Sequence, residues 1–232
     1  MGCIWKFIKA LLGLALLAAV LTLCFLGWQG WRLYRETMEE RPLVQTVQQA
    51  RSIENYTTYE QLPPTYIQAV VAMEDERFLQ HPGVDPISLF RALMTDLKQG
   101  EWAEGGSTLS QQLAKNLFYT QDKKLTRKIA EALTALELER AYDKDEIFEL
   151  YVNSIYFGNG WYCVWDAAQG YYGLEPGALS DWQCTELACY PNAPSVFMEE
   201  ENAAALEERR QLVVDKMLSC GYLSQDQAAA LR

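Results

Sequence analysis

The most pronounced hydrophobic pattern in the chain is an uncharged segment near the N-terminus. Residues 10–28 are rich in Leu, Ala and Val and contain no charged side chain. Their number, 19, is close to the roughly 20 residues that cross a bilayer as a helix. Residues of the kind found at membrane interfaces lie at or just beyond its ends: Trp5, Lys6, Lys9, Trp28 and Trp31. The pattern predicts a transmembrane anchor.

Two other interpretations of this segment are a cleaved signal peptide and a lipoprotein signal that ends at Cys24. Both fit less well, because the small-residue cleavage pattern is missing and Leu23 stands where a small residue is needed. Basic residues lie on both sides of the segment, so the charge rule alone does not fix its orientation. With the amino terminus inside, everything after Trp31 lies outside. We therefore expect a single-pass protein of the cell membrane with its folded domain on the extracytoplasmic face.

Beyond the anchor the pattern is helical. Residues 32–62 form a polar connecting stretch, and Pro63 and Pro64 then suit the first turn of a helix. Apolar residues recur at spacings of three and four in five segments, 67–78, 109–118, 125–140, 147–157 and 206–218. Asp143 and Glu146 have capping-box spacing before the fourth of these, and Gly158 and Gly160 stand where that helix should stop. We find no alternating strand pattern and no internal repeat. The sequence predicts a mainly α protein, with a cytoplasmic stub and anchor at 1–31, a linker at 32–62 and one domain at 63–232.

The amino-acid composition limits the kinds of catalytic site that the protein can form. The net charge of −11 and the pI near 4.7 argue against a nucleic-acid partner. His81 is the single histidine, so neither a multi-histidine metal site nor an obvious Ser-His-Asp triad is available. The six cysteines show no CxxC metal pattern and read mainly as buried thiols, although a disulfide between Cys184 and Cys189 stays open. Carboxylate chemistry is favoured by elimination.

One carboxylate is out of place. On a helix, Ile67, Val70, Val71 and Phe78 form one apolar stripe, and Glu74 falls in the middle of it. Partial desolvation favours the protonated form of a carboxyl group and suits general acid or base work near neutral pH. A structural salt bridge to a buried arginine explains the pattern equally well.

Polar residues follow in a loop that includes Asp75, His81 and Asp85. Such loops commonly carry function, but each of these residues is equally suited to a structural hydrogen bond or a turn cap. Next, residues 105–116 place two glycines before a helix, with Thr108 and Gln111 at capping-box spacing. Helix starts attract anions, but the Walker spacing is absent and an ordinary capped helix is the simpler interpretation.

Basic residues are concentrated in one segment of this acidic chain. Lys115, Lys123, Lys124, Arg127 and Lys128 fall within 14 residues, which suits a phosphate or pyrophosphate ligand. Glu131 follows on the face opposite the apolar residues, so periodicity alone predicts an exposed helix salt bridge there.

Together these segments resemble the five ordered motifs of family 51 of the glycosyltransferases, the peptidoglycan glycosyltransferases found alone or as a domain of class A penicillin-binding proteins. The motifs read EDERFLQHPGVD (74–85), GGSTLSQQLAKNLF (105–118), RKIAEALTALELE (127–139), KDEIFELYVNSIYFGNG (144–160) and RRQLVVDKM (209–217). The resemblance implies a lysozyme-like, two-lobed α fold. Its smaller, membrane-dipping lobe would include residues 89–102, with Leu93, Met94, Leu97 and Trp102 as apolar surface.

The resemblance also implies a reaction. A growing glycan on undecaprenyl pyrophosphate is the donor, a lipid-linked disaccharide-peptide is the acceptor, and a β-1,4 bond forms with inversion. Glu74 matches the catalytic base and Glu131 the second essential glutamate, which assists the pyrophosphate or a divalent ion, Mg or Mn. This role replaces the salt bridge predicted from periodicity. The implied substrate-binding residues are Asp75, Phe78, His81, Arg91, Ser107, Thr108, Gln111, Gln112, Lys115, Asn116, Lys123, Arg127 and Lys128.

The match weakens after Gly160, where Cys163 and Trp165 stand in place of a usual glycine and glutamate. The 232 residues leave no room for a transpeptidase domain, so we expect glycan polymerisation without peptide crosslinking, with transpeptidases among possible partners. Two alternatives remain. One is a lysozyme-like hydrolase or lytic transglycosylase, and the other is an inactive membrane scaffold for cell-wall assembly.

Overall fold

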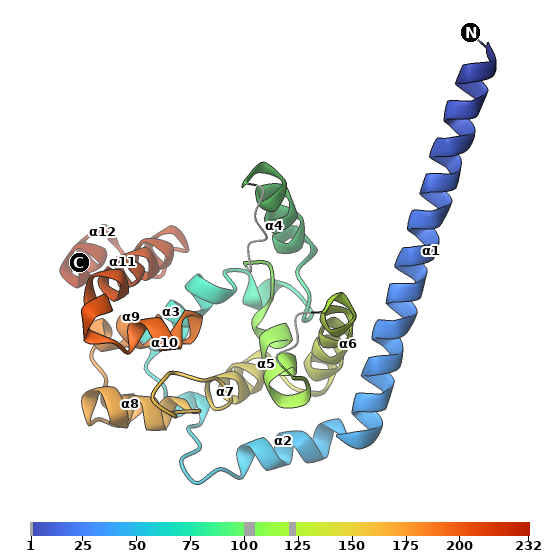
Figure 1. Cartoon of the computed structure of the whole chain (residues 1–232). Helices are drawn as coiled ribbons and strands as arrows, with labels where there is room; N and C mark the ends of the chain where they lie inside the picture. The colour runs from blue at the N-terminus through green and yellow to red at the C-terminus, as the bar shows by residue number, and fades with distance from the viewer. Residues whose placement is uncertain (1, 100–104, 121–123) are drawn as a thin grey trace.

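The protein is helical wherever its structure is described. The computed structural model describes residues 2–99, 105–120 and 124–232 (Figure 1). Within those ranges we find no strand, only an isolated bridge between Gly158 and Trp161. The mainly α fold predicted from the sequence is confirmed.

A single long helix opens the chain. α1 (Gly2–Glu40) has 39 residues and is therefore about 58 Å long at 1.5 Å per residue. Among the described residues it is the one helix long and apolar enough to cross a membrane, over Ile8–Glu40. Its C-terminal part packs on α6 (Leu125–Ala141), where Gly30 lies against Ile129 and the Tyr34 hydroxyl donates to Glu137 at 2.6 Å. The anchor is thus continuous with the folded domain.

Residues 32–62 are more ordered than the predicted linker. They comprise the end of α1, then α2 (Leu43–Arg51) and the short 3-10 helix η1 (Tyr59–Gln61). Val47 is 1% exposed and belongs to the hydrophobic core, and Arg51 pairs with Glu146 at 2.7 Å. Because these contacts attach the segment to the domain, it is part of the packed structure; its polar composition alone did not reveal this.

The core of the domain lies around α5. α5 (Leu109–Phe118) contacts α2, α6 and α7 (Lys144–Val152), while α3 (Pro64–Glu74) contacts α9 (Asp181–Leu187) and α11 (Ala203–Ser219). Tyr66, Leu109, Leu113 and Phe148 are among the fully buried residues that join these helices. The remaining elements are η2 (Phe78–Gln80), α4 (Pro86–Gln99), α8 (Val164–Tyr172), η3 (Pro176–Ala178), η4 (Tyr190–Asn192), α10 (Pro194–Phe197), η5 (Glu200–Asn202) and α12 (Gln225–Leu231).

The helix starts follow the sequence closely, whereas two helix ends do not. Capping boxes begin α5 at Thr108 and α7 at Asp143, both at the predicted positions. α3 begins at Pro64 but ends at Glu74, so residue 78 is not on the same helix as residue 74. α7 likewise ends at Val152, and the glycines predicted to stop it belong to a later turn.

α4 projects from the body of the domain toward the side on which the N-terminal half of α1 extends (Figure 1). Four of its apolar side chains are exposed: Ile87, Leu89, Phe90 and Met94. The side chains of Leu93 and Leu97, and Trp102 altogether, lie outside the described residues. The exposed residues give this projecting helix the apolar surface expected of a membrane-facing lobe.

The described cysteines are free thiols. Cys163, Cys184 and Cys189 are buried, Cys220 is half-buried and Cys24 is exposed. The disulfide left open between Cys184 and Cys189 is not formed.

Candidate active site

Glu74 lies at the last position of α3 and is held from a neighbouring helix. Gln112 of α5 donates from Nε2 to Glu74 Oε2 at 2.8 Å. The buried Tyr151 donates a longer hydrogen bond, 3.4 Å, to the other end of the Gln112 amide. Burial, with the charge of Glu74 adding to it, raises the pKa of Tyr151 well above its ordinary value of 10, so this phenol stays a neutral donor. The Glu74 carboxylate is half-buried and has a fixed orientation.

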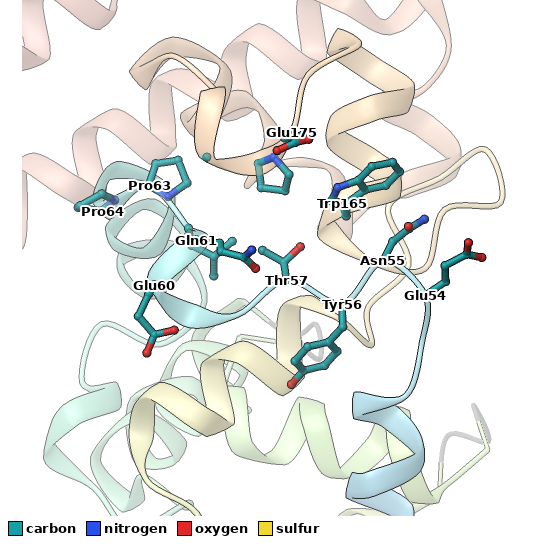
Figure 2. Close-up of a pocket in the computed structure, with 13 residues that line it drawn as sticks. Glu54, Asn55, Tyr56, Thr57, Glu60, Gln61, Pro63, Pro64, Trp165 and Glu175 are labelled. Atoms are coloured by element: carbon teal, nitrogen blue, oxygen red, sulfur yellow. The ribbon is translucent and has the colours of Figure 1, made fainter.

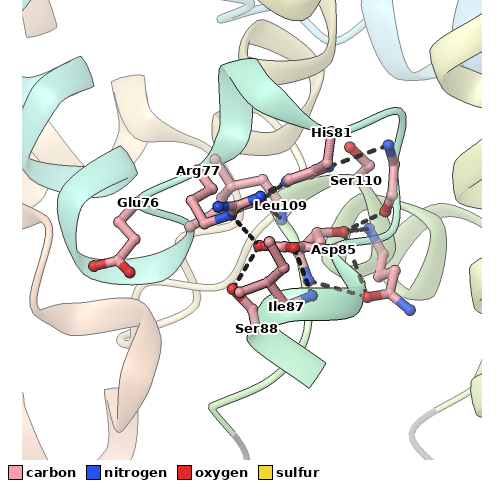
Figure 3. Close-up of polar contacts among 12 residues, drawn as sticks. Glu76, Arg77, His81, Asp85, Ile87, Ser88, Leu109 and Ser110 are labelled. Carbon is pink, nitrogen blue, oxygen red and sulfur yellow. Dashed lines mark hydrogen bonds and ion pairs between the residues drawn. The ribbon is translucent and has the colours of Figure 1, made fainter. Parts of the chain in front are cut away.

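Asp75 ties the loop after α3 to the start of α5. Its carboxylate accepts the backbone N–H of Leu109 at 2.9 Å and lies 3.0 Å from Nε2 of His81. The Nδ1 atom of His81 accepts the N–H of Gly83 at 3.2 Å, which assigns the ring proton to Nε2. Figure 3 shows this network beside His81 and Leu109. Asp75 therefore satisfies two buried donors at once, on the residue next to Glu74.

A second carboxylate, Asp85, fixes the far end of the same loop. It accepts from Arg77 Nε at 2.9 Å, from Ser88 Oγ at 2.6 Å and from the N–H of Ile87 at 2.9 Å (Figure 3). Burial opposes ionisation of Asp85, but the hydrogen bonds from Ser88, Ile87 and Arg77 outweigh it and lower its pKa to about 2. The loop between α3 and α4 is consequently anchored by ionised, fully hydrogen-bonded groups.

The start of α5 is locked to this loop. Thr108 Oγ1 donates to the carbonyl of Gly83 at 2.6 Å while Thr108 and Gln111 form the capping box. Gly83 has φ +101°, and a Cβ there would come within 2.8 Å of the Ala135 carbonyl oxygen. Only glycine fits this backbone. Thr108 and Gln111 are thus buried in the architecture of the helix start.

The basic segment assembles around Glu131 on α6. Arg127 Nε and Lys128 Nζ each lie 3.1 Å from a Glu131 carboxylate oxygen, and the glutamate is fully buried. Lys128 also donates to Ser107 Oγ at 2.7 Å, which joins this group to the segment before α5. Periodicity predicted that this salt bridge is exposed to solvent. That prediction is wrong, because this face of α6 packs on α5.

Other predicted substrate residues occupy different positions. Arg91 extends from α4 and pairs with Glu76 of the loop after α3 at 2.5 Å. Lys115 and Asn116 are half-buried on α5, about one turn beyond Gln112. Lys123 lies outside the described residues.

Phe78 and His81 are buried and form an edge-on ring pair. Lys144 Nζ lies 4.4 Å from the Phe78 ring centroid and donates to the His81 carbonyl and to Glu139, each at 2.7 Å. The buried rings of Phe78 and His81 thus support the loop through packing and through these contacts with Lys144. Sequence reasoning missed Lys144 and Tyr151, because both belong to α7 and reach the site only through the tertiary fold.

The described residues contain no group of three or more His, Cys, Asp or Glu side chains arranged to hold a metal ion. Glu131 is instead met by two cationic side chains. The donors that the structure describes therefore do not form a metal site from protein ligands alone.

Two cavities lie away from Glu74. One of about 440 Å³ lies between α1 and α6, and Arg32, Tyr119, Lys124 and Arg127 are among its lining residues. The other, of about 680 Å³, is lined by residues 54–57, 60–64, 165 and 175–177. The first borders the basic segment at the anchored side of the domain.

The sequence that carries this site matches a known family. A family model described as Transglycosylase matches residues 40–218, most of the chain. The chain belongs to the transglycosylase family. Its transglycosylase domain begins before α2, which agrees with the packing of α2 onto the core.

Individual relatives support this membership. The transglycosylase chain is 42% identical over 172 residues to penicillin-binding protein 1A of Aquifex aeolicus and 41% identical over 170 residues to penicillin-binding protein 1A of Escherichia coli. It spans only 24% and 20% of those two proteins, although 74% and 73% of the chain itself is matched. A protein of Cupriavidus necator provisionally named a transglycosylase is 35% identical, with 94% of this chain and 88% of that protein covered.

Proposed function

We propose that this transglycosylase polymerises a lipid-linked disaccharide-peptide into β-1,4 glycan strands, with Glu74 as the catalytic base. The observation that carries the proposal is the position of Glu74, a half-buried carboxylate at the end of α3 that accepts a hydrogen bond from Gln112 at 2.8 Å, next to a loop that Asp75 and Asp85 anchor through hydrogen bonds. The relatives of this chain in Aquifex aeolicus and Escherichia coli are named for binding penicillin, and they share the matched domain. Glycan synthesis fits both observations.

In the proposed step, Glu74 takes the proton from the 4-hydroxyl of the acceptor sugar while that oxygen attacks the anomeric carbon of the donor. The bond between this carbon and the pyrophosphate breaks, and undecaprenyl pyrophosphate leaves from the opposite face, so the configuration inverts. A general base needs a fixed orientation toward the hydroxyl, and the Gln112 hydrogen bond supplies it for Glu74.

The basic group supports departure of the pyrophosphate. Arg127 Nε and Lys128 Nζ each lie 3.1 Å from the Glu131 carboxylate, whose charge keeps the two cations close together before substrate arrives. Their hydrogen bonds go to the Thr120 carbonyl and to Ser107 Oγ. Preorganised cations stabilise charge that develops on a leaving group without having to reorganise during the reaction. Ser107, bound to Lys128, links this group to the segment that precedes α5. We assign Glu131 the role of positioning these cations, and Lys115 that of a further phosphate contact.

The membrane supplies both lipid-linked substrates. α1 serves as the anchor, and the exposed apolar side chains of α4 give a second contact with the outer leaflet. In this orientation the amino terminus is cytoplasmic and residues after the span are extracytoplasmic. Partners on that side include transpeptidases that crosslink the product.

The test uses the full chain in detergent micelles, with radiolabelled lipid-linked disaccharide-peptide. Wild type should release undecaprenyl pyrophosphate and form a polymer visible on a gel. Glu74→Gln keeps the size of the side chain and its contact with Gln112 but removes the base, so we expect polymer formation to fall by roughly 100- to 10,000-fold.

Glu208→Gln is the matched control, because Glu208 is exposed on α11. Near-normal polymer from Glu74→Gln would retire the assignment. Degradation of preformed glycan by wild type, with no polymer formed, would instead establish the hydrolase alternative.

A further inference from the structure

The basic group on α6 can serve only one of the two pyrophosphates that the proposed reaction brings to the protein. The donor loses its pyrophosphate, whereas the acceptor keeps its own on the inner sugar of the disaccharide while the 4-hydroxyl of the outer sugar reacts. A second anion site must therefore lie one disaccharide away from Glu74. The larger cavity does not supply it, because no lysine or arginine is among the described residues that line that cavity (Figure 2).

Two cations from different helices meet at Glu76, in the loop that follows Glu74. Arg91 Nη1 of α4 lies 2.5 Å from Glu76 Oε1, and Lys216 Nζ of α11 lies 4.0 Å from Glu76 Oε2. α4 and α11 stand apart, and the loop that carries Glu76 lies between them (Figure 1). In Figure 3 the Glu76 carboxylate points away from the network around Asp85. Glu76 thus joins the projecting helix α4 to the body of the domain.

These three side chains carry an excess of positive charge. Arg91 and Lys216 share the single negative charge of Glu76, which is the only anionic partner that either cation has within the described part of the chain. The Lys216 contact, at 4.0 Å, is at the outer limit of an ion pair. Arg91 is exposed, and Glu76 and Lys216 are half-buried, so solvent reaches all three. The group can therefore attract a further anion, and phosphate oxygens form strong charge-assisted hydrogen bonds with such cations.

The position of these cations fits an anion that belongs to a lipid. Glu76 is two residues beyond Glu74, so the Cα atoms of the two glutamates are at most about 7 Å apart. Arg91 directly follows the exposed Phe90 on α4, the helix proposed to contact the outer leaflet. A long cationic side chain beside apolar groups that enter lipid extends toward the polar surface of the membrane, where the phosphate groups lie. The pyrophosphate of a lipid-linked substrate lies at the same level.

On the basis of the glycan synthesis proposed above, we propose that Arg91 and Lys216 form a second anion site, which binds the pyrophosphate of the acceptor. In the free protein the Glu76 carboxylate occupies this site. The pyrophosphate then replaces Glu76 as the partner of both cations, because its several oxygens carry more charge and can contact Arg91 and Lys216 at once. The acceptor is thereby fixed at its pyrophosphate end while its 4-hydroxyl faces Glu74.

Initial-rate kinetics on the full chain in detergent tests this site. A labelled lipid-linked tetrasaccharide is the donor, and the concentration of unlabelled lipid-linked disaccharide-peptide, the acceptor, is varied. Lys216→Gln removes one cation of the site, so the acceptor KM should rise roughly tenfold, while kcat and the donor KM stay within about twofold of wild type. Lys216→Arg keeps the positive charge and should bring the acceptor KM back to within about threefold of wild type.

Glu76→Gln should act in the opposite direction. It removes the internal competitor and leaves both cations in place, so the acceptor KM should fall by about two- to fivefold. A bridge that merely held α4 in position would instead lose activity in both variants. Glu208→Gln is the matched control, because it removes an exposed glutamate of α11 outside the site, and its kinetic constants should equal those of wild type.

The outcomes separate this site from the Glu74 assignment. An unchanged acceptor KM in Lys216→Gln, an equal rise of the donor and acceptor KM in that variant, or a raised acceptor KM in Glu76→Gln would each overturn the second anion site while wild type still forms polymer. Absence of polymer with wild type itself would overturn the proposed function, and the second anion site with it.

Discussion

Replacing Asp75 with asparagine should create a conflict that no rearrangement of hydrogens resolves. The carboxylate accepts from two donors, Leu109 N–H and His81 Nε2. His81 Nε2 lies 3.0 Å from both carboxylate oxygens, so an asparagine that keeps its one oxygen toward the Leu109 N–H turns its NH2 group toward the His81 Nε2–H donor. The other histidine tautomer carries its proton on Nδ1. That proton would face the N–H of Gly83, which in the wild-type structure donates to Nδ1.

The expected cost follows from this geometry. The buried His81 donor then faces a second donor and keeps only a shared hydrogen bond to the remaining oxygen, so the cost is at most that of one unsatisfied donor, about 1–3 kcal/mol. For a chain of this size, roughly 2 kcal/mol lowers the melting temperature by about 4–8 °C. Thermal unfolding of the full chain in detergent, followed by tryptophan fluorescence at one scan rate, measures this shift. Polymer formation should also fall, since Asp75 is the neighbour of Glu74.

A double-mutant cycle separates this explanation from a general loss of packing. His81→Leu removes one of the two donors, so the single amide oxygen of the introduced asparagine is free to accept from Leu109 in the double variant. In that background, Asp75→Asn should cost at least about 1 kcal/mol less than in wild type. An equal cost in both backgrounds, or a wild-type melting temperature for the single variant, would refute the reasoning.

Three further predictions concern other parts of the molecule. Glu131→Gln removes the negative partner of Arg127, so polymerisation should fall by roughly 100-fold in the gel assay. Phe90→Asp should slow polymerisation in liposomes much more than in micelles, because the exposed ring loses its apolar contact with lipid. Burial raises the pKa of Cys184 and of Cys189 from 9.0 to about 12, so the unfolded chain ionises first. The two buried thiols therefore stabilise the folded state fully below pH 9. The free energy of unfolding, measured by denaturant titration, should decline from pH 9 toward pH 12.

The sequence predicted the starts of helices well where a local capping motif marks them. Periodicity and capping boxes located the starts of α5 and α7, because these depend on local spacing and on side-chain to backbone bonds. The helix predicted at 125–140 is α6, but the predicted exposure of its polar face is wrong, because α6 is packed by α1 and by α5. Glu131 on that face is buried, although the charged residues Arg127 and Lys128 lie one turn before it.

The candidate site was predictable as a set of residues but not as an arrangement. Glu74 was singled out by an apolar stripe that includes residue 78, yet α3 ends before that residue. The contact with Gln112 and the double role of Asp75 join segments more than 30 residues apart, which no local pattern encodes. The motif resemblance supplied the identities, and the tertiary structure supplies the contacts.

Because α1 continues without a break from the predicted span into the folded domain, the anchor is a helical connection and not a flexible tether. Its length of about 58 Å exceeds the roughly 30 Å thickness of the hydrocarbon layer. The part of α1 beyond the bilayer packs against α6 at Gly30, where any side chain would collide with Ile129. The height and azimuth of the domain above the lipid surface are thereby set by one rigid rod. A tilt or rotation of that rod within the bilayer turns Glu74 and its surroundings by the same angle, so membrane thickness itself becomes a variable that acts on the enzyme.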